Sequence, residues 1–206
     1  MSTDKPYLHP YREAQDQHGA DFGVTLWANQ RSQHRRFKVF TQMCFFTGKH
    51  LLDAGCSRGD FAAFLLENGI EYARYVGIDA LDQLIGYAKQ RGLRDARFVC
   101  GDFLTQPKLM KTGKPQIICI SGSLNTMDLD VALNALQSAW DATRETLIFN
   151  FLSDQAYKPA PTQGDPARRH DTFKLLNWAL SQTWAVQFRH DYFQNGHDAT
   201  IMMRKP

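Results

Sequence analysis

Three acidic residues stand at the ends of short apolar runs, at Asp53, Asp79 and Asp102. The first run, which begins at Leu51, passes into a turn with two glycines, Gly55 and Gly59, before a helical pattern starts. Glycine lets a backbone reverse direction while lying against a ligand, and the amides at the start of the following helix favour negative charge. A strand, a glycine turn and a helix in this order are typical of a nucleotide cofactor site.

The other two acids fit the same site. Asp79 ends the run that begins at Tyr75, 26 residues after Asp53, which suits an acid that binds both ribose hydroxyls. Asp102 is followed by Phe103, so a carboxylate could accept from an adenine amino group while a ring packs on the base. Because parallel strands end at one edge of a sheet, these strand ends predict a single site.

An NAD-dependent oxidoreductase is the alternative with the same order of elements. Its fingerprint needs three glycines as G-x-G-x-x-G, and the first of them would fall at Asp53. The end of the chain also reads as two strands, 184–193 and 197–203, around an Asn-Gly turn at Asn195 and Gly196. Both features disfavour the oxidoreductase.

The sequence resembles the class I S-adenosylmethionine-dependent methyltransferases over roughly residues 30 to 204. Motif I of that family is an acid, any residue, Gly-Cys-Gly, any residue, Gly, and it stands here as Asp53 to Gly59 with Ser57 at the middle glycine. The resemblance implies an α/β fold with a doubly wound, mostly parallel seven-stranded sheet, an antiparallel C-terminal hairpin and helices on both faces. It also divides the chain into an N-terminal extension or helical lid, 1–29, and a methyltransferase domain, 30–206.

The resemblance implies S-adenosyl-L-methionine as cofactor, with the motif I turn on its methionine part and the later acids on ribose and adenine. An N-terminal lid helix could bring Gln33 or Arg36 to the cofactor carboxylate. The candidate cofactor-binding residues are Asp53, Gly55, Cys56, Ser57, Gly59, Asp79, Ala80, Asp102, Phe103, Ser121, Gln33 and Arg36.

The candidate catalytic residues are Asn125, His34 and His190. Asn125 follows the fourth strand, which in the family faces the methyl group, and the Pro-Pro-aromatic motif of enzymes that methylate base amines is absent there. Either histidine could act as a base if it lies within hydrogen-bond reach of the acceptor. Tyr7, Tyr11 and Trp27 could form an aromatic wall around a substrate or simply pack the extension onto the core.

Helical spacing predicts further helices between the strands. Leu129, Leu133, Leu136 and Trp140 indicate one that begins near Asp128. The last helix before the hairpin is indicated by Phe173, Leu176 and Leu180. The Pro-rich segment 158–166 follows the fifth strand and is expected to be a loop, which either covers a substrate pocket or is a stiff surface connection.

A small-molecule methyl acceptor is the favoured partner, and an RNA or protein methyltransferase or a non-catalytic cofactor-binding module are the alternatives. A net charge of +3 decides little, and Arg31, Arg35 and Lys38 share one helical face that we expect to be solvated. The oligomeric state stays open.

The four cysteines form no C-x-x-C pair, so we expect them to be reduced and a structural metal to be absent. No apolar run is long enough to cross a bilayer, and the first ten residues lack an apolar signal core. These features predict a cytoplasmic protein without a membrane partner.

Overall fold

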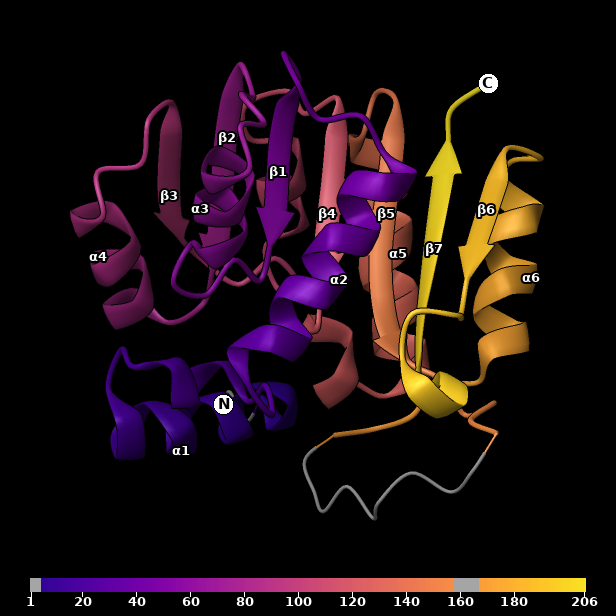
Figure 1. Ribbon diagram of the computed structural model, residues 1–206, viewed down its shortest axis with the longest axis horizontal. Helices are drawn as coiled ribbons and strands as arrows, with labels where there is room; N and C mark the ends of the chain where they lie inside the picture. Colours follow the sequence, from indigo (N-terminus) through magenta and orange to yellow (C-terminus); the bar gives the residue numbers. More distant parts are fainter. Residues whose placement is uncertain (1–4, 158–166) are drawn as a thin grey trace.

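A seven-stranded mixed sheet forms the centre of the computed structural model, which describes residues 5–157 and 167–206. The strand order is β3-β2-β1-β4-β5-β7-β6, as Figure 1 shows from left to right. The strands are β1 (His50–Ala54), β2 (Arg74–Asp79), β3 (Ala96–Cys100), β4 (Ile117–Ser121), β5 (Thr146–Leu152), β6 (Val186–Arg189) and β7 (Asp198–Arg204).

The first five strands are parallel, and β7 runs antiparallel to both β5 and β6. The carboxyl ends of β1 to β5 therefore share one edge of the sheet. Because β7 is antiparallel, its first residue, Asp198, pairs with Leu152 at the end of β5. The beginning of β7 thus lies at the edge where the parallel strands end.

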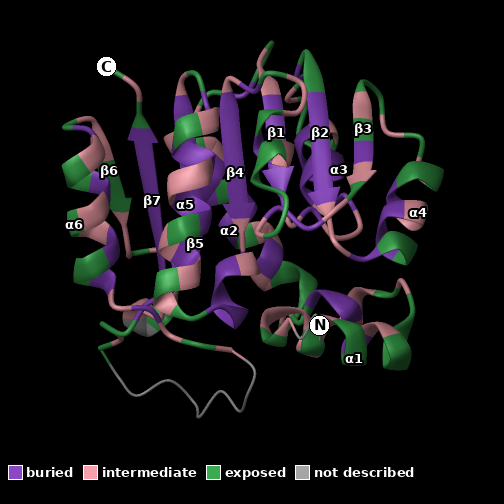
Figure 2. Ribbon diagram, turned by 180° about the vertical axis from the view of Figure 1, so that it is seen from behind, coloured by how far each residue is buried: buried purple, intermediate pink, exposed green. Residues whose placement is uncertain are grey.

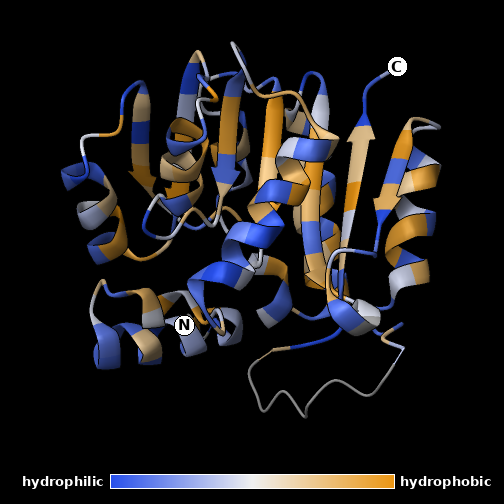
Figure 3. Cartoon of the chain, viewed as in Figure 1, coloured by the Kyte–Doolittle hydropathy of each residue, from blue (hydrophilic) through white to orange (hydrophobic). Residues whose placement is uncertain are grey.

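Helices cover both faces, as the resemblance predicted. One apolar cluster joins the sheet to α2 (Gln30–Met43), α3 (Asp60–Glu67) and α4 (Asp82–Gln90) through residues such as Phe40, Phe61 and Ile85. A second cluster joins the opposite face to α5 (Leu129–Ala142), α6 (Thr172–Gln182) and the 3-10 turn η3 (Pro107–Lys111). Every residue of β5 is buried, and Figures 2 and 3 show β4 and β5 as a buried, largely hydrophobic centre.

The predicted helix near Asp128 is confirmed, with Asp128 at the N-cap position of α5. The last helix is also confirmed as α6, but two of the residues that indicated it do not face the core. Phe173 and Leu180 are exposed, whereas Leu175 and Ala179 are buried. The reason is that hydrophobic residues occupy more than one side of α6, so spacing alone did not single out the face that packs.

The C-terminal hairpin is present, but its predicted tight turn is wrong. The strands are shorter than expected, and residues 190–197 connect β6 to β7 with a 3-10 turn, η5 (Gln194–Gly196), inside the connection. The first paired residues, Arg189 and Thr200, lie well outside the Asn-Gly dipeptide. The aromatic residues of this connection serve the site described below rather than the ladder.

The N-terminal segment lies across the carboxyl edge of the sheet (Figure 1). It contains η1 (Pro6–Leu8), α1 (His9–His18) and η2 (Phe22–Thr25). Ala14 and Val24 pack with Leu81 and Leu84, which come from the turn after β2 and from α4. This contact holds the segment over the strand ends.

Candidate active site

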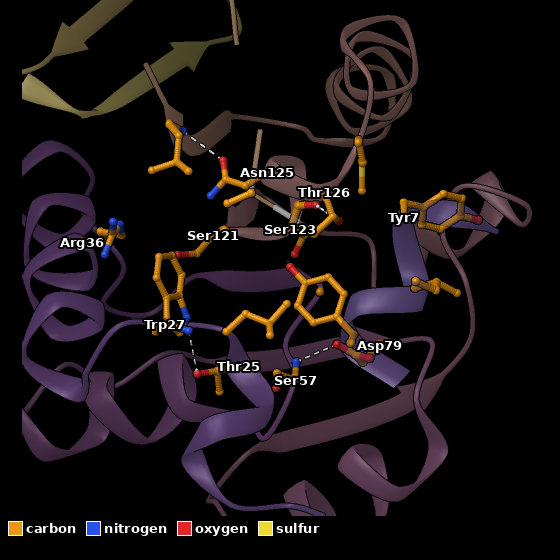
Figure 4. A pocket seen from close by; sticks show the side chains of 18 of the residues that line it. Tyr7, Thr25, Trp27, Arg36, Ser57, Asp79, Ser121, Ser123, Asn125 and Thr126 are labelled. Atoms are coloured by element: carbon orange, nitrogen blue, oxygen red, sulfur yellow. Dashed lines mark hydrogen bonds between the residues drawn. The ribbon is translucent and has the colours of Figure 1, made fainter. Parts of the chain in front are cut away.

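A cavity of about 440 Å³ runs along the carboxyl edge of the sheet, beneath the N-terminal segment. Its volume falls within the roughly 300–1,000 Å³ of small-molecule sites. Figure 4 shows Arg36 and Trp27 at one end, and Asp79 and Tyr7 at the other. From one end to the other, it is lined by residues of the turns after β3, β2, β1 and β4, by Leu152 at the end of β5 and by His197 just before β7.

The turn after β1 keeps the backbone close to the cavity. Gly55 has a φ of 81°, and a Cβ at this position would lie 1.8 Å from Oγ of Ser123. Ser57, which replaces the family glycine, has a φ of 48° and so carries a side chain in the left-handed region. Its Oγ is buried and has no hydrogen-bond partner among the described residues, which leaves a polar atom for a ligand to satisfy.

Asp79 connects this turn to the end of β2. Its Oδ2 accepts from the amide of Ser57 at 2.8 Å and its Oδ1 from the amide of Leu81 at 3.0 Å. Burial raises the pKa of the carboxyl, while these amide hydrogen bonds act in the opposite direction. Each carboxylate oxygen has a lone pair left, so Asp79 can still accept from two vicinal hydroxyls, and Ala80 beside it also lines the cavity.

Asp102 is bound by the N-terminal segment. Its Oδ2 accepts from Nζ of Lys5 and from the hydroxyl of Tyr7, both at 2.7 Å, and its Oδ1 accepts from the amide of Leu104. Burial would raise the pKa of Asp102, but these hydrogen bonds outweigh it and the net shift is downward. Asp102 and Phe103 line the cavity next to Tyr7, where a flat, apolar base could pack.

Asp53 does not line the cavity. Side chains alternate along β1, so Asp53 lies on the same face of the sheet as Leu51 and is buried there. Its carboxylate accepts a hydrogen bond from the hydroxyl of Tyr75, and burial raises its pKa to about 7. The structure therefore places Asp53 beneath the turn rather than beside a ligand.

Cys56 and Gly59 also lie behind the turn. A Cβ on Gly77 of β2 would be 2.7 Å from Sγ of Cys56, and a Cβ on Gly59 would be 2.8 Å from the ring of Phe98. Gly59 has a φ of 73° at the N-cap of α3. Both residues pack the turn against the sheet, and neither lines the cavity.

The end of β4 is held by two asparagines. Asn150, fully buried on β5, accepts from the amide of Gly122 at 2.9 Å and donates to Oγ of Ser121 at 3.1 Å. Oδ1 of Asn125 accepts from the amide of Leu152 at 3.0 Å, and its Nδ2 has no partner among the described residues. Ser121 and Asn125 both line the cavity, so the predicted positions at the fourth strand are brought to the site.

Arg36 also reaches the cavity, but its charge is already matched. Its guanidinium pairs side-on with the buried carboxylate of Asp198 and donates to the carbonyl of Ser32 at 3.1 Å. The same guanidinium lies over the rings of Trp27, at 4.2 Å, and Phe193, at 4.6 Å. Gln33 instead donates to Asp60 at the start of α3 and does not line the cavity.

Neither predicted histidine is at the cavity. The ring of His34 packs against Phe64, with centroids 5.3 Å apart, on the side of α2 that faces α3. His190 stacks on Phe188 of β6. In the described part of the chain, the histidine that lines the cavity is His197, which the sequence pattern did not indicate.

The residues that the sequence did not indicate include His197 and Phe193, which line the cavity, and Asp198, which pairs with Arg36. The antiparallel direction of the last strand was a usable signal, because it brings the residues just before that strand to the edge where β5 ends. Trp27 and Tyr11 line the cavity, as the aromatic-wall interpretation expected. Arg31, Arg35 and Lys38 are exposed, as predicted for a solvated face.

The site chemistry fits S-adenosylmethionine. Asp79 can accept hydrogen bonds from the vicinal hydroxyls of a ribose, and a flat base can pack on the apolar surface beside Phe103 and Leu81. The unpartnered Oγ of Ser57 lies in the turn after β1.

Residues 51–146 match the family model described as a methyltransferase domain. No curated protein matched the sequence.

Similar folds occur among solved structures. Magnesium protoporphyrin IX methyltransferase from Synechocystis PCC 6803 with bound S-adenosylmethionine has a TM-score of 0.67 and 13% identity, with all of both chains covered. An S-adenosylmethionine-dependent methyltransferase from Archaeoglobus fulgidus has a TM-score of 0.63 and 14% identity. The alignment covers 86% of this chain and 95% of that protein's chain. The pyocyanin biosynthetic protein PhzM has a TM-score of 0.63 and 15% identity over 98% of this chain and 69% of its own.

The fold is that of the Rossmann-like methyltransferase class. Residues 51–146 match a methyltransferase domain, and the solved structures that share the fold include S-adenosylmethionine-dependent methyltransferases. Within the described residues, no helix is long and apolar enough to cross a membrane, and no cluster of His, Cys, Asp or Glu could hold a metal ion. The segment 158–166, expected to be a loop, lies outside the described residues.

Proposed function

We propose that the chain is an S-adenosylmethionine-dependent methyltransferase and that it acts on a small-molecule acceptor. The observation that carries the proposal is the continuous cavity that runs from Asp102 to His197 beneath the N-terminal segment. An acceptor must enter that covered space to meet the methyl group, which suits a small molecule better than a polymer. Among the solved structures with a similar fold, one is named for a porphyrin substrate and another for pyocyanin biosynthesis. Both names support a small-molecule acceptor.

The residues divide by their place along the edge. Asp102 and Phe103 would hold the adenine, Asp79 and Ala80 the ribose, and Gly55, Ser57 and Ser121 the methionine part. Asp53, Cys56 and Gly59 would support the turn from behind, while Gln33 would hold α2 against α3 through Asp60. Asn125 would orient the acceptor with its amide nitrogen, and Arg36 lies at the acceptor end.

The bound donor supplies a methyl group on a positively charged sulfur. The protein's part is then to align the acceptor with that methyl and to exclude water. The N-terminal segment, expected to be a lid, does the second task through Tyr11, Trp27 and the contacts of Lys5 and Tyr7 with Asp102.

Calorimetry with S-adenosylmethionine and S-adenosylhomocysteine tests the cofactor roles. Asp79→Asn should weaken both affinities at least tenfold, because a hydrogen bond to a charged acceptor contributes about 1.5–3 kcal/mol. Asp82→Asn is the matched control, since Asp82 is an exposed carboxylate on α4 that does not line the cavity. Equal affinity for the wild type and the Asp79 variant would contradict the assignment.

A transfer screen with tritiated methyl donor tests the acceptor class. Small metabolites, total RNA and total protein are offered separately. We expect label in the small-molecule fraction. Label in RNA or protein alone, or in no fraction despite intact cofactor binding, would count against a small-molecule acceptor.

A further inference from the structure

His197 lies at the end of the cavity opposite to Asp102. Its imidazole packs against Phe193 with the rings tilted by 39° and their centroids 4.9 Å apart, and its Nε2 lies 3.6 Å from Oδ2 of Asp198. The side chain is 29% exposed, so one part of the ring is held by the protein and another can be reached from the cavity. Its carbonyl accepts from the amide of Ser153, which anchors the backbone at the end of β5.

The charged groups around His197 include one carboxylate and three guanidiniums. Asp198 is shared between the imidazole and the guanidinium of Arg36, and Arg169 donates to the carbonyl of His197 at 3.3 Å. The guanidinium of Arg35 also lies over the ring of Phe193, 5.1 Å from its centroid. Among the described residues, the carboxylates that line the cavity are Asp79 and Asp102, both on the cofactor side.

Within residues 5–157 and 167–206, no carboxylate lines the cavity at this end, which disfavours an ammonium acceptor. The walls there are the flat rings of Trp27 and Phe193, which suit a flat aromatic molecule. Tyr11 also lines the cavity, but burial raises its pKa to about 12, so its phenolate is scarce near neutral pH. Among the described residues that line this end, His197 is the one whose side chain has a basic ring nitrogen that can accept a proton.

We propose that His197 is the general base for an aromatic hydroxyl acceptor, an inference that rests on the methyltransferase function proposed above. The carboxylate of Asp198 favours the proton on Nε2, which leaves the lone pair of Nδ1 to accept the hydroxyl proton. The hydroxyl oxygen forms the new bond to the methyl carbon, and the electrons of the carbon–sulfur bond stay on sulfur. The products are an aryl methyl ether, S-adenosylhomocysteine and a proton, which His197 returns to solvent.

The test uses 4-nitrophenol, whose phenol and phenolate absorb at different wavelengths. It is titrated into protein saturated with S-adenosylhomocysteine, at a pH where the free probe is mostly the neutral phenol. We expect the wild type to bind the probe and to raise its phenolate fraction several-fold, because the imidazole accepts the proton. His197→Gln should lose this rise, while benzylamine should not displace the probe.

His34→Gln is the matched control, because His34 packs between α2 and α3 away from the cavity and should leave the phenolate signal unchanged. Thermal unfolding of each variant, and its affinity for S-adenosylhomocysteine, are measured first. Failure of S-adenosylhomocysteine to bind the wild type would overturn the function itself. If it binds but the probe does not, or if His197→Gln raises the phenolate fraction as the wild type does, the general-base proposal alone is overturned.

Discussion

Trp27 lies so close to Gly122 that a Cβ on the glycine would be 2.4 Å from Cζ2 of the indole. Gly122 follows β4, and Trp27 comes from the N-terminal segment, so this contact seats the segment on the strand end. Gly122 also has a φ of 82°, and its amide is bound by Asn150. The contact depends on a residue without a side chain at this position.

Gly122→Ala should therefore displace Trp27 as well as strain the backbone. We expect a loss of about 2–4 kcal/mol in the free energy of unfolding, from overpacking and the left-handed φ together. Chemical denaturation measures it. Trp27→Ala combined with Gly122→Ala should recover the overpacking part, so a double variant that is as destabilised as the sum of the singles would argue against a direct clash.

Replacing Ser57 with glycine should stabilise the turn after β1. Ser57 is held at a φ of 48°, which costs a residue with a side chain roughly 1–2 kcal/mol, whereas glycine adopts it freely. Ser57→Ala is the control, because it removes Oγ but keeps the strain. We expect Ser57→Gly to have the higher midpoint of thermal unfolding of the two; a lower midpoint would show that the turn is not strained.

Asp53 should make stability fall as the pH rises. Its pKa is raised to about 7 in the folded state, so between about pH 4 and pH 7 the folded protein holds a proton that the unfolded chain has released. The stabilising contribution is complete below about pH 4 and is lost as the pH passes 7. Compared with Asp53→Asn, the wild type should lose about 1–4 kcal/mol across this window, at about 1.4 kcal/mol per pKa unit.

Urea denaturation of both proteins at pH 5 and pH 8 checks this difference. Asp82→Asn, at an exposed carboxylate, is the control and should follow the wild type. A constant difference between wild type and Asp53→Asn at the two pH values would mean that Asp53 does not titrate in this range.

Replacing only one partner of the ion pair between Arg36 and Asp198 should lower the free energy of unfolding substantially. Both side chains are almost fully buried, so removing one partner leaves an unpaired charge at a cost of about 3–5 kcal/mol. Arg36→Met and Asp198→Asn should each lower the unfolding free energy by this amount, and the double variant should lose less than their sum. Arg35→Met, at an exposed neighbour, should change stability by less than about 1 kcal/mol.

The fold and the strand ends that line the cavity could be predicted because their signals are local. The strand ends at Asp79 and Asp102 and the turn at Gly55 need only a run of apolar residues followed by an acid or a glycine. The face of α6 could not be predicted in the same way, since Phe173 and Leu180 have the spacing of a core face and are exposed. Which side of that helix is buried depends on the sheet beside it.

By itself, the sequence determined the class of fold and the strand ends that meet at the cavity, because short-range patterns specify strands, turns and their order. Only the tertiary structure decided that Asp53 lies behind the turn with Tyr75 and that Lys5 and Tyr7 bind Asp102. It also decided that His197, and not His34 or His190, lines the cavity. These outcomes depend on contacts between residues far apart in the chain, made when the antiparallel β7 and the N-terminal segment meet at one edge of the sheet.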